Sequence, residues 1–591
     1  MWSAARPRAR GPNPPPRPSQ GVTAVRYLTH DALLADIGRD PLLTGCGAVA
    51  VDGADSRALR VDATLALLKA VSRRRPDLRI VLLCDDAGEA GRLADWWGRG
   101  TGVAGAAPSP GAALISVSPP PFPVRVQYLT APAPSYVSAA ADAVRSLHAA
   151  GVPGDVGVAA PTPAAAAAIA AALRADLPPP HKGRSLVVLV LAGDGDDDDA
   201  AAAALAPPRA DARRAVVVAD DGAGGGLATT PLINLAAVVD TMLTTRAGVG
   251  AGDGVPWRRV APISAAEAAA RAARAGRRRP GVCVRLATEE AAGVLEERPP
   301  AGVGAADLAP TLLRLKALGV DAPLALPWPT RPPPAAVAAG LESLFALGAV
   351  DAGGRLTPAG ARMAELPLPP RLARALLAGG DAGVGGAVAT VCALAGVRSI
   401  FSAAAARAAG FPLEAAVASF AASEGDPLTW LNVWRAWDAA GRRGAFASAA
   451  GLDQRALLRA ADVRAQLLAH AVRVGVPVGD ADAPLVYGAG DAVARALAAG
   501  LFAAAARSVG PAPGGGPEEY EPLAPCDGGV PARLRLVRPS VLAGAAPPPR
   551  FILVGDHAPP TPDADDAWTG VRWAMAVDAD ALRGVAPHYF A

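Results

Sequence analysis

The sequence predicts an α/β fold for the first half of the chain, a mainly α-helical fold for the second half, and a small β-rich part at the end. Short runs rich in Val, Ile and Leu alternate with longer amphipathic segments in the first half, which is typical of a parallel α/β sheet. From 372 to 472 the chain is rich in Ala and Leu at helical spacing. After 509 it becomes rich in Pro and Gly, with short apolar runs.

The expected elements follow this pattern along the chain. Between 22 and 103 the expected order is helix, strand, helix, strand. Strands are expected at the short apolar runs 46–52, 79–86, 154–160, 185–192, 214–220, 236–242, 281–287, 532–537 and 550–556. Helices are expected over 308–320, 335–350 and most of 372–472. A connector rich in Gly, Pro and Ser spans 104–121, and an acidic loop spans Asp194 to Asp199.

Composition narrows the class of protein. The chain has 591 residues, enough for about four domains. Its net charge of +3 does not require a polyanionic partner. The five cysteines are scattered without a Cys-x-x-Cys pair, which argues against a zinc site and against a disulfide framework. No apolar run reaches the roughly 18 residues of a membrane span without a charge, proline or glycine, so we expect no membrane span.

The first residues of the chain have a composition of their own. Up to residue 30 there is no Asp or Glu, and several Arg are present, which is one mark of a transit peptide. The prolines at 14–16 argue against an amphipathic presequence helix. A disordered tail rich in Pro and Arg, spanning 1–21, is the favoured interpretation.

Several segments, taken in order, resemble one known family. They are 25–43, 49–87, 122–144, 263–291, 308–320, 341–377, 423–437, 458–467, 496–508, 537–542 and 586–590. Together they resemble the DEAH/RHA (DEAH-box) family of ATP-dependent RNA helicases, which includes the pre-mRNA-splicing helicases. No single segment is decisive, but their order and spacing from about residue 22 to the end carry the resemblance.

The resemblance implies a fold that combines α/β and α domains. Two tandem RecA-like (P-loop NTPase-like) domains, the first incomplete, would precede winged-helix, helical ratchet-like and OB-fold domains. The implied bounds are 22–118 and 119–300 for the RecA-like domains, 301–371 for the winged-helix domain, 372–490 for the helical ratchet-like (helicase-associated) domain and 491–591 for the OB-fold domain.

The family holds ATP with a Gly-x-x-x-x-Gly-Lys-Ser/Thr loop, whose lysine reaches the phosphates. The chain has three lysines, Lys69, Lys182 and Lys316, and none follows Gly or precedes Ser or Thr. The glycine-rich run Gly222 to Gly226 has no lysine. The resemblance begins after the place where the family carries the loop, so the first domain would lack its first strand and helix. We therefore expect no cofactor, although ATP and Mg²⁺ are cofactors of the family.

The positions that match the DEAH box read Asp52, Gly53, Ala54 and Asp55. In the family the Asp holds the Mg²⁺ shell and the Glu activates the attacking water. Asp52 remains as a vestigial catalytic candidate, with a polar strand end as the alternative. Gly53 cannot act as a base, and Asp55 is displaced by three residues from the position of the Asp.

Other positions of the family's motifs also differ. The Ser-Ala-Thr motif is matched by Cys84, Asp85 and Asp86, which place two carboxylates near the expected RNA path. The Thr-Asp-Gly contact is matched by Thr29, His30 and Asp31, and the fifth motif by 219–226, whose polar side chains are replaced.

The last motif is matched by 270–277, where Arg274 and Arg277 stand at the positions of the family's arginine fingers. Three residues apart, they are expected to share a helical face. Arginine fingers stabilise charge on a transferring phosphoryl group. The alternative is a solvated or packing-related basic cluster that includes Arg278 and Arg279.

For RNA binding, Arg533, Arg535 and Arg538 are the candidate residues, as a basic strip in the OB-fold segment. The alternative is that alternating arginines on the exposed face of a strand have no binding role, since such patterns are common on protein surfaces.

Three tryptophans, at 430, 434 and 437, are spaced so that they share one face of a helix. We expect this face to pack into a core.

We favour a helicase-like protein without catalysis that acts as a scaffold or partner-binding protein in RNA processing or pre-mRNA splicing. Its expected partners are RNA or RNA-processing proteins. Its expected location is nuclear, with cytoplasmic or organellar locations as alternatives. The competing hypotheses are an active ATP-dependent RNA helicase with a truncated gene model, and a relic that cannot fold.

Overall fold

The computed structural model describes residues 25–98, 111–117, 122–181, 184–191, 198–207, 211–220, 226–232, 234–249, 256–397, 399–479, 489–512, 515–523, 533–557, 568–587 and 589–590. The tail predicted at 1–21, Asp194 to Asp197, Gly222 to Gly225 and most of the predicted connector lie outside these residues. The chain divides into two compact units. Unit 1 comprises described residues of Met1–Ser116 and Pro300–Glu365, and unit 2 those of Val117–Pro299 and Leu366–Ala591.

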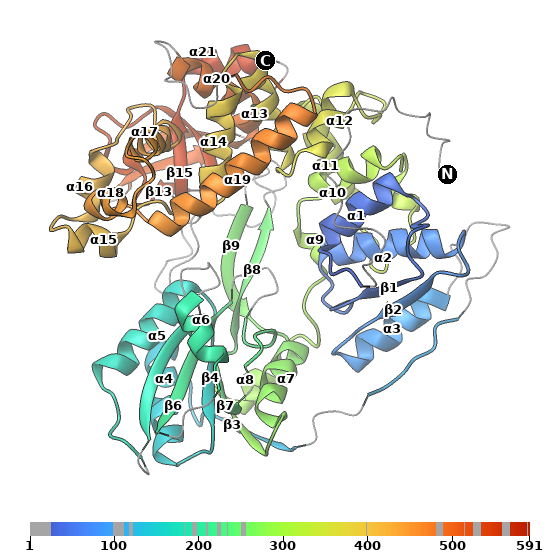
Figure 1. Cartoon of the computed structure of the whole chain (residues 1–591), viewed down its shortest axis with the longest axis vertical. Helices are drawn as coiled ribbons and strands as arrows, with labels where there is room; N and C mark the ends of the chain where they lie inside the picture. The colour runs from blue at the N-terminus through green and yellow to red at the C-terminus, as the bar shows by residue number, and fades with distance from the viewer. Residues whose placement is uncertain are drawn as a thin grey trace. The chain divides into compact units, whose positions relative to one another are not determined.

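The first part of unit 1 has the predicted order of elements. Its elements are α1 (His30–Arg39), β1 (Ala48–Val51), α2 (Leu59–Ser72), β2 (Arg79–Leu82) and α3 (Ala87–Gly98), shown in blue in Figure 1. The two strands pair in parallel, with Val51 opposite Leu82. Helix α2 is buried along most of its length because apolar side chains occur all round it.

The second part of unit 1 is helical, as its periodicity predicts. Its main helices are α10 (Ala309–Ala317), α11 (Pro334–Ala346) and α12 (Pro358–Glu365), with the short α9 (Gly302–Ala305) before them. Helix α10 packs on α11 and α12. Arg92 of α3 donates from Nη1 to the Pro329 carbonyl at 2.8 Å, so the two sequence-distant parts of this unit are joined by a hydrogen bond.

Unit 2 begins with a six-stranded parallel sheet in the order β3-β10-β7-β4-β6-β5. The strands are β3 (Val124–Tyr128), β4 (Asp155–Ala160), β5 (Ser185–Leu191), β6 (Ala212–Ala219), β7 (Leu235–Asp240) and β10 (Gly281–Arg285). The central strands β4 and β7 are buried at every position because both faces of the sheet are covered. Helices α4 (Tyr136–Ala149) and α5 (Pro163–Ala175) cover one face.

The five strands predicted for this part are confirmed, but three strands were not predicted as such. One is β3, and the other two form the antiparallel hairpin of β8 (Leu243–Val249) and β9 (Pro256–Pro262). The hairpin strands contain Thr, Arg, Gly and Pro, so they lack the continuous apolar run that predicted the others. The opposite face of the sheet carries α7 (Ala265–Ala273), which packs through Ala272 beside Cys283.

The next part of unit 2 is helical, as predicted. Its longer helices are α13 (Pro370–Asp381), α14 (Gly385–Ala395), α17 (Asp426–Ala439), α19 (Gln454–Arg473) and α20 (Ala489–Leu501), and its shorter ones are α15 (Ala403–Ala408), α16 (Leu413–Ala418) and α18 (Gly444–Ala449). Trp434 and Trp437 are buried in the core of these helices, as their spacing predicts. None of the described helices combines the length and hydropathy that a membrane span needs.

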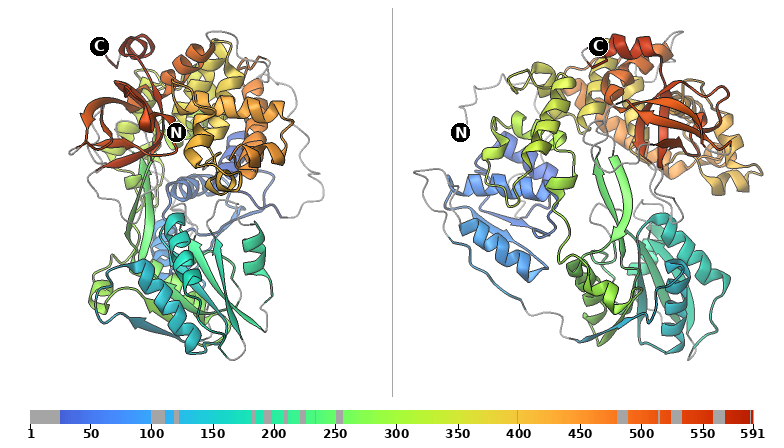
Figure 2. Two further views of the ribbon diagram at one scale, coloured as in Figure 1. Left: turned by 90° about the vertical axis from the view of Figure 1, so that its left-hand side faces the viewer. Right: turned by 180° about the vertical axis from the view of Figure 1, so that it is seen from behind.

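The chain then forms a closed five-stranded barrel in the order β11-β12-β13-β15-β14, in orange and red in Figure 2. Its strands are β11 (Ala505–Pro511), β12 (Glu518–Pro522), β13 (Leu534–Leu536), β14 (Phe551–His557) and β15 (Thr569–Ala576), and α21 (Ala579–Val585) follows. Of these, β13 and β14 were predicted. The buried Tyr520 belongs to the barrel core.

A buried carboxylate joins the barrel to the helices. Asp426, the first residue of α17, is 4% exposed. Its Oδ2 accepts from Ser540 Oγ at 2.7 Å and from Ala574 N at 2.8 Å, and its Oδ1 accepts from Val541 N at 2.9 Å. Burial raises the pKa of Asp426 to about 6, although these three donors lower it.

We predict that Asp426→Ala lowers the free energy of unfolding by about 3 kcal/mol, because three buried donors lose their acceptor. Urea denaturation followed by the near-ultraviolet circular dichroism of the tryptophans measures the change. The matched control is Asp438→Ala on the same helix, whose partially exposed carboxylate pairs only with Arg442 and should change stability by less than about 1 kcal/mol. Equal effects of the two variants would contradict the role given to Asp426.

Candidate functional site

The positions that match the DEAH box lie directly after β1. Asp52 is exposed, and Gly53 has a φ of 63°, a left-handed conformation that favours glycine over any residue with a side chain. The half-buried Asp55 accepts from the backbone N–H groups of Asp85 at 2.9 Å and Asp86 at 2.8 Å. Its carboxylate therefore joins the loops that follow β1 and β2.

The charge around these loops is negative and partly desolvated. Burial raises the pKa of Asp55, against the hydrogen bonds from Asp86 and Asp85. Burial and then the nearby carboxylates, Asp55 first among them, raise the pKa of Cys84 to about 11, so this thiol stays protonated at neutral pH. Among the described residues, no group of three or more His, Cys, Asp or Glu is placed to hold a metal ion.

The described lysines do not fit a phosphate site. Lys69 is buried in α2, where its Nζ donates to the Trp96 carbonyl and lies 4.4 Å from the centre of the Trp96 ring. Lys316 donates to the Asp321 carbonyl at 3.0 Å. The third, Lys182, lies outside the described residues. Together with Gly53 in place of a carboxylate, this means that the described residues do not fit ATP with Mg²⁺.

In unit 2, three charged side chains meet at the carboxyl edge of the sheet, where α/β folds place ligands. Asp220 follows β6, Asp240 ends β7, and Arg271 comes from α7. Arg271 Nη1 lies 2.8 Å from Asp240 Oδ1, and its Nη2 lies 3.3 Å from Asp220 Oδ2. All three are buried, and Thr244 Oγ1 also donates to Asp220.

The two aspartates keep Arg271 charged in spite of its burial. Burial disfavours the guanidinium, yet Asp240 and then Asp220 raise the pKa of Arg271 above its ordinary value. Arg271 lies in the segment 270–277, for which the sequence predicts a role only for Arg274 and Arg277. The sequence feature that points to this site is a pair of apolar strands that each end in an aspartate, Asp220 and Asp240.

The two arginines at the finger positions have different surroundings. Arg274 is buried in a 3-10 turn after α7, and its Nη2 donates to the Thr230 carbonyl. Arg277 and Arg278 are exposed. Half-buried Arg279 donates to the Pro153 carbonyl at 2.7 Å and to Asn234 Oδ1 at 3.1 Å. Arg274 therefore packs inside unit 2, in agreement with the packing-related form of the alternative, whereas Arg277 and Arg278 lie at the surface.

The candidate RNA-binding arginines lie where the sequence predicts, but each has a carboxylate beside it. Leu534 and Leu536 of β13 point into the barrel, which leaves the arginines outside. The ion pairs are Arg533 with Glu521 at 3.7 Å, Arg535 with Glu519 at 2.7 Å and Arg538 with Glu414 at 2.6 Å. The positive charge expected of a basic strip is thus offset in part by three glutamates, of which Glu521 also pairs with Arg507 at 3.9 Å.

Comparison with known proteins places the chain among helicases. The family model described as helicase associated domain (HA2), winged-helix, matches residues 340–368. The chain is 29% identical over 498 residues to the human probable ATP-dependent RNA helicase DHX35, covering 83% of this chain and 68% of that protein. It is 30% identical over 447 residues to the Caenorhabditis elegans DHX35 homolog, covering 76% of this chain and 60% of that protein.

Two further matches agree. The Schizosaccharomyces pombe pre-mRNA-splicing factor ATP-dependent RNA helicase prp22 is 27% identical over 460 residues, which cover 77% of this chain and 38% of that protein. The crystal structure of the Escherichia coli DExH-box NTPase HrpB matches with a TM-score of 0.64 and 21% identity, covering 94% of this chain and 57% of that one. The likeness to HrpB shows the fold, and the chain spans only part of the length of these relatives.

We predict that Arg271→Met destabilises unit 2 by about 3–5 kcal/mol, because it leaves two buried carboxylates without their cation. Thermal unfolding followed by circular dichroism measures the loss. Arg277→Met, six residues on and exposed, is the matched control and should change stability by less than about 0.5 kcal/mol. If Arg271→Met were as stable as the control, the triad would not support the sheet edge.

Proposed function

Since the chain belongs to the DEAH-box family of RNA helicases, we propose that it is a helicase-like protein without ATPase activity, acting as a scaffold or partner-binding protein in RNA processing. One observation carries the proposal. Glycine occupies the position where the family needs a carboxylate, and the next carboxylate, Asp55, is bound to two backbone N–H groups. The other carboxylate of this loop, Asp52, stands at the position of the family's metal-holding Asp, so the position of the family's base carries no carboxylate.

The surroundings of the other motif residues support the same conclusion. A phosphoryl-transfer site needs cations directed at the phosphates. Arg274 is directed at the Thr230 carbonyl instead, and Lys69 at the Trp96 carbonyl. These cations stabilise the fold. Asp52, at the position of the metal-holding Asp, is exposed and is left without the neighbouring glutamate that hydrolysis requires.

The domains that would position a phosphoryl-transfer site are folded around buried cores. The parallel RecA-like sheet, the helices after it and the barrel all have buried cores. A fold can persist after its chemistry is lost, and its surfaces can then serve in binding. This contrast between intact cores and replaced motif residues favours a scaffold over a relic that cannot fold.

The proposal extends to the domains. We assign 22–118 to an incomplete first RecA-like domain, 119–300 to the second, 301–371 to the winged-helix domain, 372–490 to the ratchet-like helical domain and 491–591 to an OB-fold. The family-model match at 340–368 supports the winged-helix domain at 301–371. The closed five-stranded barrel supports the OB-fold at 491–591.

The proposed setting is pre-mRNA splicing in the nucleus, with RNA or RNA-processing proteins as partners. Its support is the printed role of one relative, a pre-mRNA-splicing factor that is 27% identical to this chain. Localisation of the tagged chain in its own cells, together with identification of the co-purifying RNA, tests this setting.

We predict that the purified chain releases no phosphate from ATP above the blank, with or without single-stranded RNA. A phosphate-release assay measures this, with an active DEAH-box helicase as positive control. Gly53→Glu should not restore turnover, since none of the three lysines follows Gly or precedes Ser or Thr. RNA-stimulated turnover that disappears in the variant Asp52→Asn, which alters only an exposed side chain, would instead favour an active helicase.

We also predict that replacing Arg533, Arg535 and Arg538 together by Gln changes RNA affinity by less than about threefold, because a phosphate would have to displace a glutamate from each arginine. Fluorescence anisotropy with labelled RNA at several salt concentrations measures the affinity. A loss of more than about tenfold, with a log–log salt slope smaller by about 2, would identify the strip as a phosphate-binding surface.

A further inference from the structure

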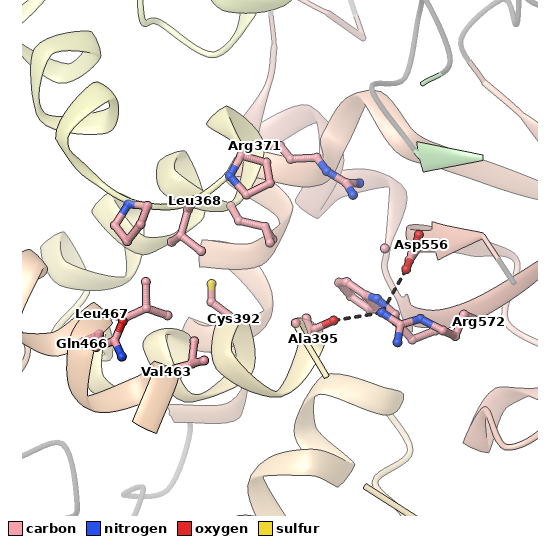
Figure 3. Close-up of a pocket in the computed structure, with 15 residues that line it drawn as sticks. Leu368, Arg371, Cys392, Ala395, Val463, Gln466, Leu467, Asp556 and Arg572 are labelled. Carbon is pink, nitrogen blue, oxygen red and sulfur yellow. Dashed lines mark hydrogen bonds and ion pairs between the residues drawn. The ribbon is translucent and has the colours of Figure 1, made fainter. Parts of the chain in front are cut away.

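A pocket of about 390 Å³ lies in unit 2 where helices α13, α14 and α19 meet strands β14 and β15 of the barrel (Figure 3). Its volume falls within the roughly 300–1,000 Å³ that is typical of small-molecule sites. We propose that this pocket binds a small organic anion with an apolar body. The proposal is independent of the proposed function, because it concerns no motif residue of the helicase family.

The floor of the pocket is apolar and comes from three helices. Leu372 of α13, Cys392 of α14 and Leu467 of α19 are buried and line it, and Val463 lies one turn before Leu467. Burial raises the pKa of the Cys392 thiol to about 12, so the thiol stays neutral and adds to the apolar surface. These side chains fit the apolar body of a ligand.

One end of the pocket carries a guanidinium in a fixed position. Arg572 of β15 donates from Nη1 to the Val397 carbonyl at 2.9 Å and from Nη2 to the Ala395 carbonyl at 2.9 Å. Its Nη2 also lies 2.9 Å from Asp556 Oδ2, as the dashed lines in Figure 3 show in part. Arg572 therefore fixes this wall of the pocket in place before a ligand enters, which lowers the entropic cost of binding, and since Asp556 offsets its charge the net positive charge of the lining corresponds to Arg371.

The charges of the lining favour an anion over a cation. Arg371 and Arg572 line the pocket together with a single carboxylate, that of Asp556, so the lining carries a formal charge of +1. Arg371 comes from the first turn of α13, at another wall than Arg572. A carboxylate or sulfonate between these walls would meet a positive potential while its apolar body covers the floor.

The pocket exists only while the barrel is docked on the helices. Trp573 of β15 is 2% exposed and lines it, and a Cβ atom on Gly555 would lie 2.0 Å from the Trp573 ring. Glycine at this position is therefore required for the wall to form. A ligand that binds here binds only the docked arrangement, so it raises the midpoint of thermal unfolding, and the stabilisation grows with the logarithm of the ligand concentration once this exceeds the Kd.

The test uses two fluorescent probes on the full chain, anionic anilinonaphthalene sulfonate and neutral N-phenylnaphthylamine. We expect saturable binding of one molecule per chain, tighter for the sulfonate, and a higher unfolding midpoint at saturation. Arg371→Gln should weaken the sulfonate about tenfold and leave the neutral probe unchanged. Ala395→Phe should abolish both, since the ring fills the pocket while the Ala395 carbonyl remains.

The matched control is Arg374→Gln, one turn along α13 and outside the lining, which should leave both affinities unchanged. Binding that does not saturate, or that weakens equally in the two arginine variants, would overturn the proposal. If Ala395→Phe loses its cooperative unfolding transition, the comparison of Arg371→Gln with Arg374→Gln decides the outcome by itself.

Discussion

The carboxylate of Asp426 is the contact on which the second half of unit 2 depends. It starts α17 and accepts hydrogen bonds from the loop before the barrel and from strand β15. A negative group at the first turn of a helix also interacts favourably with the helix dipole. Because the donors come from segments more than a hundred residues away, one buried side chain joins α17 to the barrel. Arg572, which lines the pocket, joins the barrel to the helices at a second place.

Several charged residues of this chain lie in segments that match the motifs of the helicase family, and their contacts stabilise the fold. Arg271 neutralises Asp220 and Asp240 at the carboxyl edge of the sheet, and Asp55 joins the loops after β1 and β2. The arginines on the barrel are paired with glutamates. A buried charge that is satisfied internally, such as that of Arg271, is not available to a phosphate, which links these local contacts to the proposed absence of catalysis.

Prediction from the sequence succeeded where burial is continuous. The central strands β4, β6 and β7 are apolar along their length because both faces of a parallel sheet are covered, so they were predicted close to their observed bounds. It failed for the hairpin β8–β9 and for β12, whose residues are polar or include proline. It left open whether Arg274 is solvated or packed, because nothing local in a run of arginines shows which one turns inward. The domain bounds and the OB-fold remain predictions.

By itself, the sequence determined the family, the order of α/β and α parts, and the replacement of the DEAH box, since these depend on residue identity and periodicity along the chain. Only the tertiary structure decided that Arg274 is buried, that Arg271 bridges two aspartates and that the barrel arginines are paired with Glu414, Glu519 and Glu521. The physical reason is that a charge acts on what lies within a few ångströms in space, and such neighbours can be more than a hundred residues apart in the chain.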